Sequence, residues 1–173
     1  MAAATDAVHT ELADALRACG LRVTAPRLGV LLALRSRPHS DTESVIRAVR
    51  LELGSVSAQA VYNVLAALVD VGLVRRIEPA GSPALYEVRV GDNHHHIVCR
   101  ICGATTDVDC AVGRRPCLTP SETHGYDLDE AEVTFWGLCP DCRSSASSAT
   151  GGSRTRPENR VRARPADEME ASR

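Results

Sequence analysis

The sequence predicts an α+β fold in which a winged helix-turn-helix unit precedes a smaller α/β unit. Three observations lead to this prediction: four helical patterns fill the first seventy residues, two short apolar stretches joined by a turn follow them, and the helical period disappears beyond about residue 91. The predicted divisions are a winged-helix domain over 1–90, an α/β domain over 91–142 and a disordered tail over 143–173, where apolar residues are almost absent.

The four helices are predicted by apolar spacing and by the residues at their ends. Residues 8–19 form the first, and Gly20 follows as a stop signal. Thr24-Ala25-Pro26 opens the second, because proline in the first turn loses no hydrogen bond. Ser40 or Asp41 can cap the third helix, which runs to about Leu53, and Ser57 can cap the fourth, from about Ala58 to Val71.

Two strands follow the helices, Leu73–Glu78 and Ala84–Val90, joined by a turn sequence over 79–83. Helices closed by a hairpin have the element order of a winged helix. The fourth helix is then the one that enters the major groove of DNA.

The α/β unit is predicted to contain short strands at 97–98, 104–108 and 131–136. Thr119-Pro120-Ser121-Glu122 carries a helix-opening signature, so a short helix is expected to start there. Large apolar side chains are few in this unit, and a metal ion or an oligomer would help such a thin core to hold together.

Charge is distributed unevenly along the chain. Residues 1–90 hold ten Arg and nine acidic residues, residues 91–142 hold three Arg and nine, and residues 143–173 hold seven Arg and four. The acidic middle section favours a cation site. No apolar run reaches the roughly 18 residues of a membrane span, and the first residues do not form a secretory signal, so we expect no membrane association and a cytoplasmic location.

Four of the seven cysteines form two Cys-x-x-Cys pairs, at Cys99 and Cys102 and at Cys139 and Cys142. Two such pairs supply the four thiolates of a closed tetrahedral zinc site. The alternative is four unrelated buried thiols. Disulfides are not expected in a reducing cytoplasm.

Histidines and carboxylates form a second candidate cluster. In a strand, His94 and His96 point to one face, while Glu87 precedes them and Asp107 follows on the next strand. With His39, these groups suit a divalent ion such as iron, manganese or zinc. The alternatives are a solvated polar turn for the histidine run and a surface position for His39.

Four segments, taken together, resemble the ferric uptake regulator family in order and spacing. They are 20–27, 56–65, 94–102 and 139–142, and the resemblance extends over about residues 8–142. It implies a homodimer with an N-terminal winged helix and a C-terminal α/β dimerisation domain. It also implies a structural Zn²⁺ on the four cysteines and a regulatory metal site that comprises His39, Glu87, His94, His96 and Asp107. A further metal site of some members would need donors near Asn93 and Ala131, and is not expected here.

Segments 107–113, 116–118 and 136–140 are similar to an actinobacterial branch of that family, which contains peroxide-responsive repressors of catalase-peroxidase genes. The resemblance therefore implies a metal-dependent transcriptional repressor, with Fe²⁺ or Mn²⁺ in the regulatory site, and peroxide sensing through oxidation of His39 or His94 beside ferrous iron. The alternative is an iron- or zinc-responsive repressor of metal uptake genes. Glu87 is typical of iron sensors and Asp107 of peroxide sensors, so the two carboxylates favour different functions.

Two further alternatives concern the chemistry. Cys110 and Cys117 could sense peroxide by forming a disulfide. A zinc enzyme would need an open zinc and a general base, but the four-cysteine site is closed and no acid–base pair is evident.

On the fourth helix, Tyr62 and Asn63 are the expected base readers, because asparagine can pair with adenine and an aromatic edge can contact the thymine methyl group. For Tyr62 the alternative is a core position. That helix has no Arg or Lys, so phosphate contacts are expected from arginines elsewhere, including Arg22, Arg27 and Arg75. The expected partner is a double-stranded operator, AT-rich and palindromic.

Overall fold

The computed structural model describes residues 2–88, 94–109, 118–128 and 131–148. Contacts divide the chain into one unit over 1–139 and a second over 140–173. Each unit is described by itself.

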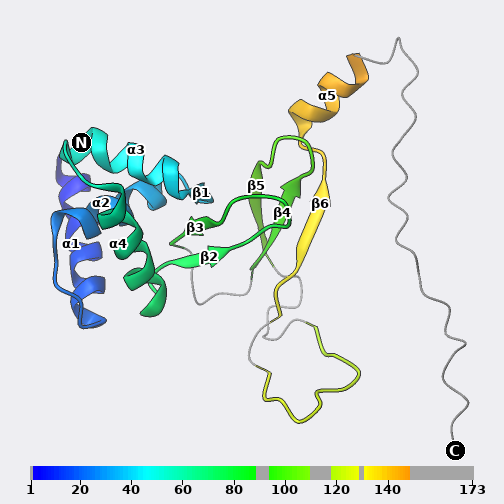
Figure 1. Cartoon of the computed structure of the whole chain (residues 1–173), viewed down its shortest axis with the longest axis horizontal. Coiled ribbons are helices and arrows are strands. Elements are labelled where there is room, and N and C mark those ends of the chain that lie inside the picture. Colours follow the sequence, from blue (N-terminus) through cyan, green and yellow to red (C-terminus); the bar gives the residue numbers. More distant parts are fainter. Residues whose placement is uncertain (1, 89–93, 110–117, 129–130, 149–173) are drawn as a thin grey trace, which may run out of the picture. The chain divides into compact units, whose positions relative to one another are not determined.

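The first unit begins with four helices, as predicted: α1 (Ala2–Ala18), α2 (Ala25–Ser36), α3 (Thr42–Leu53) and α4 (Ala58–Asp70) (Figure 1). Asp41 caps α3 by accepting a hydrogen bond from the Ser44 amide at 2.7 Å. Ser57 caps α4 through the Ala60 amide at 3.1 Å. Such caps satisfy amides that the first turn leaves unpaired.

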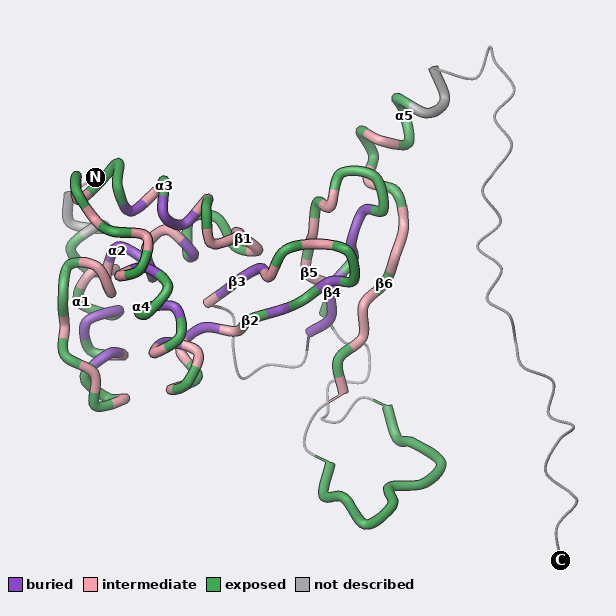
Figure 2. The backbone as a smooth tube through the Cα atoms, viewed as in Figure 1, coloured by how far each residue is buried: buried purple, intermediate pink, exposed green. Residues whose placement is uncertain are grey.

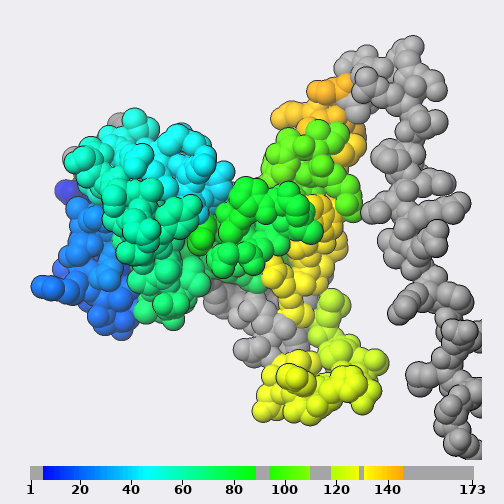
Figure 3. Space-filling model, viewed as in Figure 1, coloured from blue at the N-terminus to red at the C-terminus, as the bar shows by residue number. Residues whose placement is uncertain are grey.

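The inward faces of these helices form the main core. Leucines and valines that are almost fully buried make up its centre, and the four helices close over it (Figures 2 and 3). Burial of each such side chain contributes about 2 kcal/mol relative to exposure. The core residues from α1 to α4 include Leu16, Val30, Leu31, Leu34, Val45, Val49, Val61, Leu65 and Leu68.

A three-stranded sheet follows, with the order β1-β3-β2. Strands β2 (Arg75–Ile77) and β3 (Leu85–Glu87) are the predicted wing hairpin. Strand β1 (Ser40–Asp41) was not expected, because two residues are too few to show a pattern; it pairs antiparallel with β3.

Strand β3 separates two environments. Tyr86 belongs to the core cluster of the helices. Neighbouring side chains of a strand point to opposite faces, so Leu85 and Glu87 point away from the helices. Both are buried, and the face that carries them lies toward the second sheet.

The second sheet has the order β5-β4-β6 and contains the three strands expected in the α/β unit (Figure 1). Strand β4 (His94–Cys99) pairs antiparallel with β5 (Thr105–Asp109) and parallel with β6 (Thr134–Gly137). The register of β4 on β5 places His96 opposite Asp107.

Two expectations for the later part of the chain are wrong. No helix starts at Thr119: residues 118–128 form an exposed loop without a helix (Figure 2), with a turn in which His124 and Gly125 have φ of 50° and 81°. These positive φ values are incompatible with continuing a right-handed helix. In the second unit, α5 (Pro140–Ser148) extends into the predicted tail, so residues 143–148 are helical. The rest of that tail lies outside the described residues.

Among the described residues, no single helix is long and apolar enough to cross a membrane. Helices α3 and α4 pass the length and composition test only as a pair bent by 111°.

Candidate metal centre

Five side chains from four stretches of the first unit meet at one point. His39 directly precedes β1, Glu87 ends β3, His94 and His96 lie on β4, and Asp107 lies on β5. Continuing the β1–β3 register by one residue places His39 beside Glu87. The pairing of β1 with β3 therefore brings the backbone of His39 next to that of Glu87.

Carboxylate oxygens and imidazole Nε2 atoms face one another at short range. Nε2 of His39 lies 2.7 Å from Oδ1 of Asp107 and 2.9 Å from Oε2 of Glu87. Nε2 of His94 lies 3.0 Å from Oε1 of Glu87 and 4.0 Å from Asp107. Nε2 of His96 lies 3.4 Å from Glu87 and 3.6 Å from Asp107. Donor atoms of His39, Glu87, His96 and Asp107 all lie within 4.8 Å of one another, and His94 flanks this group.

The cluster is buried and charged. Glu87 has no exposed surface and the Asp107 side chain is 22% exposed, which makes Asp107 the most accessible member. Burial opposes ionisation of Glu87, but hydrogen bonds with His39 and His96 outweigh it and hold the pKa of this carboxyl well below its ordinary range. Burial also opposes protonation of His39, but Glu87 and Asp107 outweigh it and raise the pKa of this imidazole.

His39 has an unusual backbone conformation, with φ of 56°. The left-handed region costs a non-glycine residue about 1 kcal/mol or more. The contacts of its ring with Glu87 and Asp107 hold it there, so local backbone strain is offset by the cluster.

The donor set fits a divalent cation. Neutral imidazoles and two carboxylates carry two negative charges, which an ion of charge two neutralises, and buried charge needs such pairing. Donors bound about 2.1 Å from one ion lie about 3.0 to 3.5 Å apart, close to the 2.7–3.6 Å between the Nε2 atoms and their nearest oxygens. In addition, Nδ1 of His96 is buried without a hydrogen-bond partner among the described residues.

The cysteines form a second cluster, at the end of β4. Sulfur atoms of Cys99, Cys102 and Cys139 lie within 4.8 Å of one another, with 3.7 Å between Cys102 and Cys139. Two sulfurs bound to one zinc ion at 2.3 Å would be about 3.8 Å apart. Backbone N–H groups, that of Cys102 first and then those of Cys139 and Ile101, lower the pKa of the Cys99 thiol to about 6, which favours the ligating thiolate. Cys142 follows in the first turn of α5.

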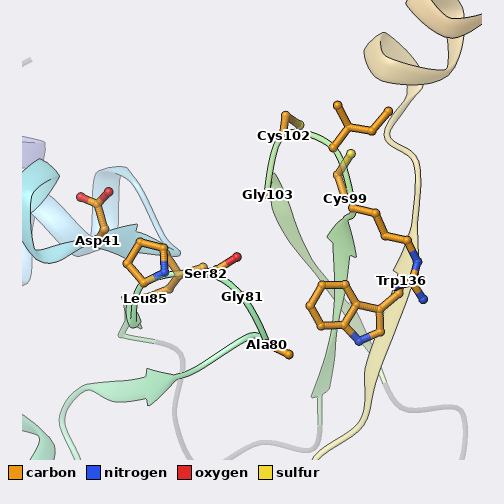
Figure 4. Close-up of a pocket in the computed structure, with 12 residues that line it drawn as sticks. Asp41, Ala80, Gly81, Ser82, Leu85, Cys99, Cys102, Gly103 and Trp136 are labelled. Atoms are coloured by element: carbon orange, nitrogen blue, oxygen red, sulfur yellow. The ribbon is translucent and has the colours of Figure 1, made fainter. Parts of the chain in front are cut away.

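A groove of about 590 Å³ lies beside this cluster (Figure 4). The turn that contains Ser82 forms one side, and the segment from Cys99 to Gly103 forms the other, next to Trp136. The Arg100 guanidinium lies 5.3 Å from the centre of the Trp136 ring. The single tryptophan of the chain therefore sits close to the cysteine cluster.

The expected DNA-contacting residues lie on separate elements. Tyr62 and Asn63 are exposed on α4, and Tyr62 is 50% exposed, so it is not a core residue. Arg22 is exposed, and the Arg27 guanidinium donates to its carbonyl oxygen at 2.7 Å. Arg75 is half-buried on β2, directly opposite Glu87 in the β2–β3 register. Cys110 and Cys117 lie outside the described residues.

Sequence reasoning missed that Asp41, besides capping α3, lies in a strand. This residue caps α3, belongs to β1 and stands two residues after His39. Aspartate is a residue type that often caps helices, so its capping role could be recognised in the sequence, but its pairing with β3 could not.

The chain is similar to known proteins over most of its length. Residues 18–136 match the model of the ferric uptake regulator family. The chain is 61% identical over 138 residues to the transcriptional regulator FurA of Mycobacterium tuberculosis, covering 80% of this chain and 94% of that protein. It is 61% identical over 121 residues to ferric uptake regulation protein 1 of Mycolicibacterium fortuitum, covering 70% of this chain and 75% of that protein.

Among solved structures, it resembles the ferric uptake regulator of Pseudomonas aeruginosa with manganese. The TM-score is 0.59 at 28% identity, covering 75% of this chain and 98% of the other.

Proposed function

The chain belongs to the ferric uptake regulator family, and on that premise we propose that it is a metal-dependent, DNA-binding transcriptional repressor. The observation that carries the proposal is the convergence of His39, Glu87, His94, His96 and Asp107 from elements on both sides of the chain's predicted division at residue 90. We propose these five residues as the regulatory metal site, with Fe²⁺ or Mn²⁺ as the ion.

The role that we propose for the site follows from the elements that carry its residues. His39 is joined to α3 through β1, whereas Asp107 belongs to the second sheet. Without an ion, the negative charge of the two carboxylates is neutralised only when imidazoles are protonated, so the contacts that join His39 to the second sheet are weaker. The orientation of α4 relative to the second sheet is then less restrained. With an ion bound, one orientation is favoured, and the ion selects it from those already present.

The orientation of α4 affects DNA binding because the proposed regulator is a dimer. In the proposed division, residues 1–90 bind DNA and residues 91–142 pair two copies of the chain. Two recognition helices then reach half-sites about one helical turn apart only at one setting. The proposed operator is palindromic and AT-rich, read by Tyr62 and Asn63, with phosphate contacts from Arg22, Arg27 and Arg75. Such a regulator acts where the DNA lies, in the cytoplasm.

The cysteine cluster has a different proposed role, as a closed structural zinc site. Cys99, Cys102 and Cys139 supply three ligands, and the spacing of the second Cys-x-x-Cys pair makes Cys142 the fourth. The site fixes the end of β4, the strand that also carries His94 and His96.

We further propose that the regulator responds to peroxide and controls oxidative-stress genes of the catalase-peroxidase type. A ferrous ion would supply the electrons that reduce peroxide, and the nearest imidazoles are the groups exposed to the oxidant. The resemblance to the family makes His39 and His94 the candidates, and their Nε2 atoms lie 2.7 to 3.0 Å from the carboxylates of the cluster. The partly exposed Asp107 marks the side from which a small molecule can approach.

A second candidate is a repressor of iron or zinc uptake genes. The residue type of Glu87 favours it, since in the family that the chain resembles glutamate at this position is typical of iron sensors.

One experiment tests the proposal and separates the two candidates. Fluorescence anisotropy would measure binding of the full chain to the DNA upstream of its own coding region and of neighbouring genes, with Fe²⁺, Mn²⁺, Zn²⁺ or no regulatory metal. A peroxide regulator releases DNA when micromolar peroxide is added to the iron-loaded form, and mass spectrometry finds added oxygen on the His39 or His94 peptide. An uptake regulator releases DNA on chelation and is insensitive to that peroxide. Equal DNA binding with and without metal would contradict the proposal.

A further inference from the structure

One face of α4 is exposed along its length, while Val61, Leu65 and Leu68 bury the opposite face in the core. The exposed positions follow helical spacing, with Gln59 nearest the start of the helix. They are Gln59, Tyr62, Asn63 and Ala66, and Asp70 lies at the far end.

Two amides on this face are joined to each other. Nε2 of Gln59 donates to Oδ1 of Asn63 at 2.9 Å, across four residues of the helix. This bond restricts the rotamers of both side chains before any partner arrives. Ordering a long glutamine side chain otherwise costs free energy on binding.

The bond leaves a defined set of groups for a partner. A side-chain amide has two N–H donors and one carbonyl acceptor, and Gln59 uses only one donor on Asn63. Gln59 therefore keeps its carbonyl oxygen and one N–H. These are the two groups that a glutamine presents to N6 and N7 of adenine in the major groove.

The position of Gln59 suits this role. It is the second residue of α4, directly after the capping turn of Ser57. In helix-turn-helix proteins, residues at the N-terminal end of the recognition helix contact the base edges. Asn63 is one turn further on.

We propose that Gln59 is a specificity-determining base reader, which selects adenine, and that Asn63 orients it in addition to making the base contact proposed above. The two amides then discriminate as one unit. This inference rests on the proposed DNA-binding function and goes beyond it, because it assigns a base preference to a residue that composition and spacing did not single out.

The test is selection from a random duplex DNA library by the full-length, metal-loaded protein, followed by sequencing. The variants are Gln59→Ala, Asn63→Ala, the double variant and Gln59→Glu. Asp70→Ala is the matched control, since it lies on the same face of α4 but at the far end. Thermal melting and zinc content check that every variant is folded. Both amides are exposed, so their truncation removes no core contact.

The expected result is a relaxed preference in Gln59→Ala at one adenine of each half-site, by about tenfold, with the other positions unchanged. Asn63→Ala relaxes that same position, and the double variant loses less discrimination there than the product of the single losses. Gln59→Glu moves the preference from adenine to cytosine, because a carboxylate accepts from cytosine N4. Asp70→Ala changes the affinity for all sequences by the same factor, so its sequence preference equals that of the wild type.

Three outcomes overturn the inference. If the Gln59→Ala profile equals the wild-type profile at every position, Gln59 reads no base. If the losses from Gln59→Ala and Asn63→Ala multiply independently, Asn63 does not orient Gln59. If the wild-type protein enriches no sequence at all, the DNA-binding proposal fails, and this inference fails with it.

Discussion

The Nε2 atom of His39 lies 2.7 Å from Oδ1 of Asp107, although 68 residues separate the two along the chain. His39 is attached to α3 through β1, and Asp107 belongs to the second sheet. This contact links the helical part of the first unit to its second sheet.

Replacing His39 should weaken metal binding and remove the dependence of DNA binding on metal. We expect His39→Ala to raise the Kd for Mn²⁺ at least about tenfold, because loss even of a group that only orients a ligand costs 10–100-fold. Isothermal titration calorimetry of the zinc-containing protein measures this. His124→Ala is the control, since the His124 side chain is 73% exposed and distant from the cluster in sequence. An unchanged Kd in His39→Ala would remove this residue from the site.

The metal-free cluster should make stability depend on pH in two directions. The pKa of Glu87 is lowered from its ordinary value of 4.5, so its contribution is present above that pH and is lost as the pH falls toward the folded-state pKa. The pKa of His39 is raised from 6.5, so its contribution is present below that pH and is lost as the pH rises through the folded-state pKa.

Melting temperatures of the protein stripped of regulatory metal, measured from about pH 3 to about pH 9, check this pair of effects. Glu87→Gln should remove the loss of stability at acidic pH and weaken the loss at alkaline pH, because it removes one of the two carboxylates that raise the pKa of His39 and leaves Asp107 in place. If Glu87→Gln retains the wild-type pH dependence, the losses of stability at acidic and alkaline pH arise from other groups.

Loss of a cysteine ligand should remove zinc and destabilise the second sheet. Cys102→Ser should contain less than the one zinc ion per chain expected of the wild type, and because zinc binding supplies folding free energy of order 10 kcal/mol, β4 and its neighbours should loosen. Metal analysis gives the zinc content, and emission from the single tryptophan, Trp136, reports the change locally. Cys19→Ser is the matched control, since Cys19 does not belong to the cluster. Full zinc content in Cys102→Ser would contradict the assignment.

Two helix caps offer a matched pair that separates stability from positioning. Asp41→Ala and Ser57→Ala each remove one capping acceptor and should each cost about 1 kcal/mol. Only Asp41 also lies in β1, beside His39. Asp41→Ala should therefore weaken metal binding severalfold, whereas Ser57→Ala should not. Equal metal affinity in the two variants would show that β1 does not position His39.

Much of the architecture could be predicted from the sequence, because helix caps, glycine stops and apolar periods act locally. All four helices of the first unit and every strand of the two sheets except β1 were predicted in this way. The convergence of the five site residues could be expected only from the family resemblance, because the pairing of β1 with β3 is set by tertiary contacts. The helix expected at Thr119 is absent. His124 and Gly125, five and six residues further on, adopt positive φ, and an opening signature at Thr119 does not by itself determine whether the following residues continue a helix.

The segment between β4 and β5 combines two roles. Gly103 has φ of 72°, its amide donates to the Cys99 carbonyl at 2.9 Å, and the Cys99 amide donates to Ala104 at 2.9 Å. The loop that holds Cys99 and Cys102 is thus also the hairpin turn that pairs His96 with Asp107. Side chains alternate along a strand, so a slip of one residue would turn His94 and His96 away from the cluster and place His95 and Ile97 on that face. Insertion or deletion of a single residue within 100–104 should therefore be far less tolerated in evolution than the same change within 118–128.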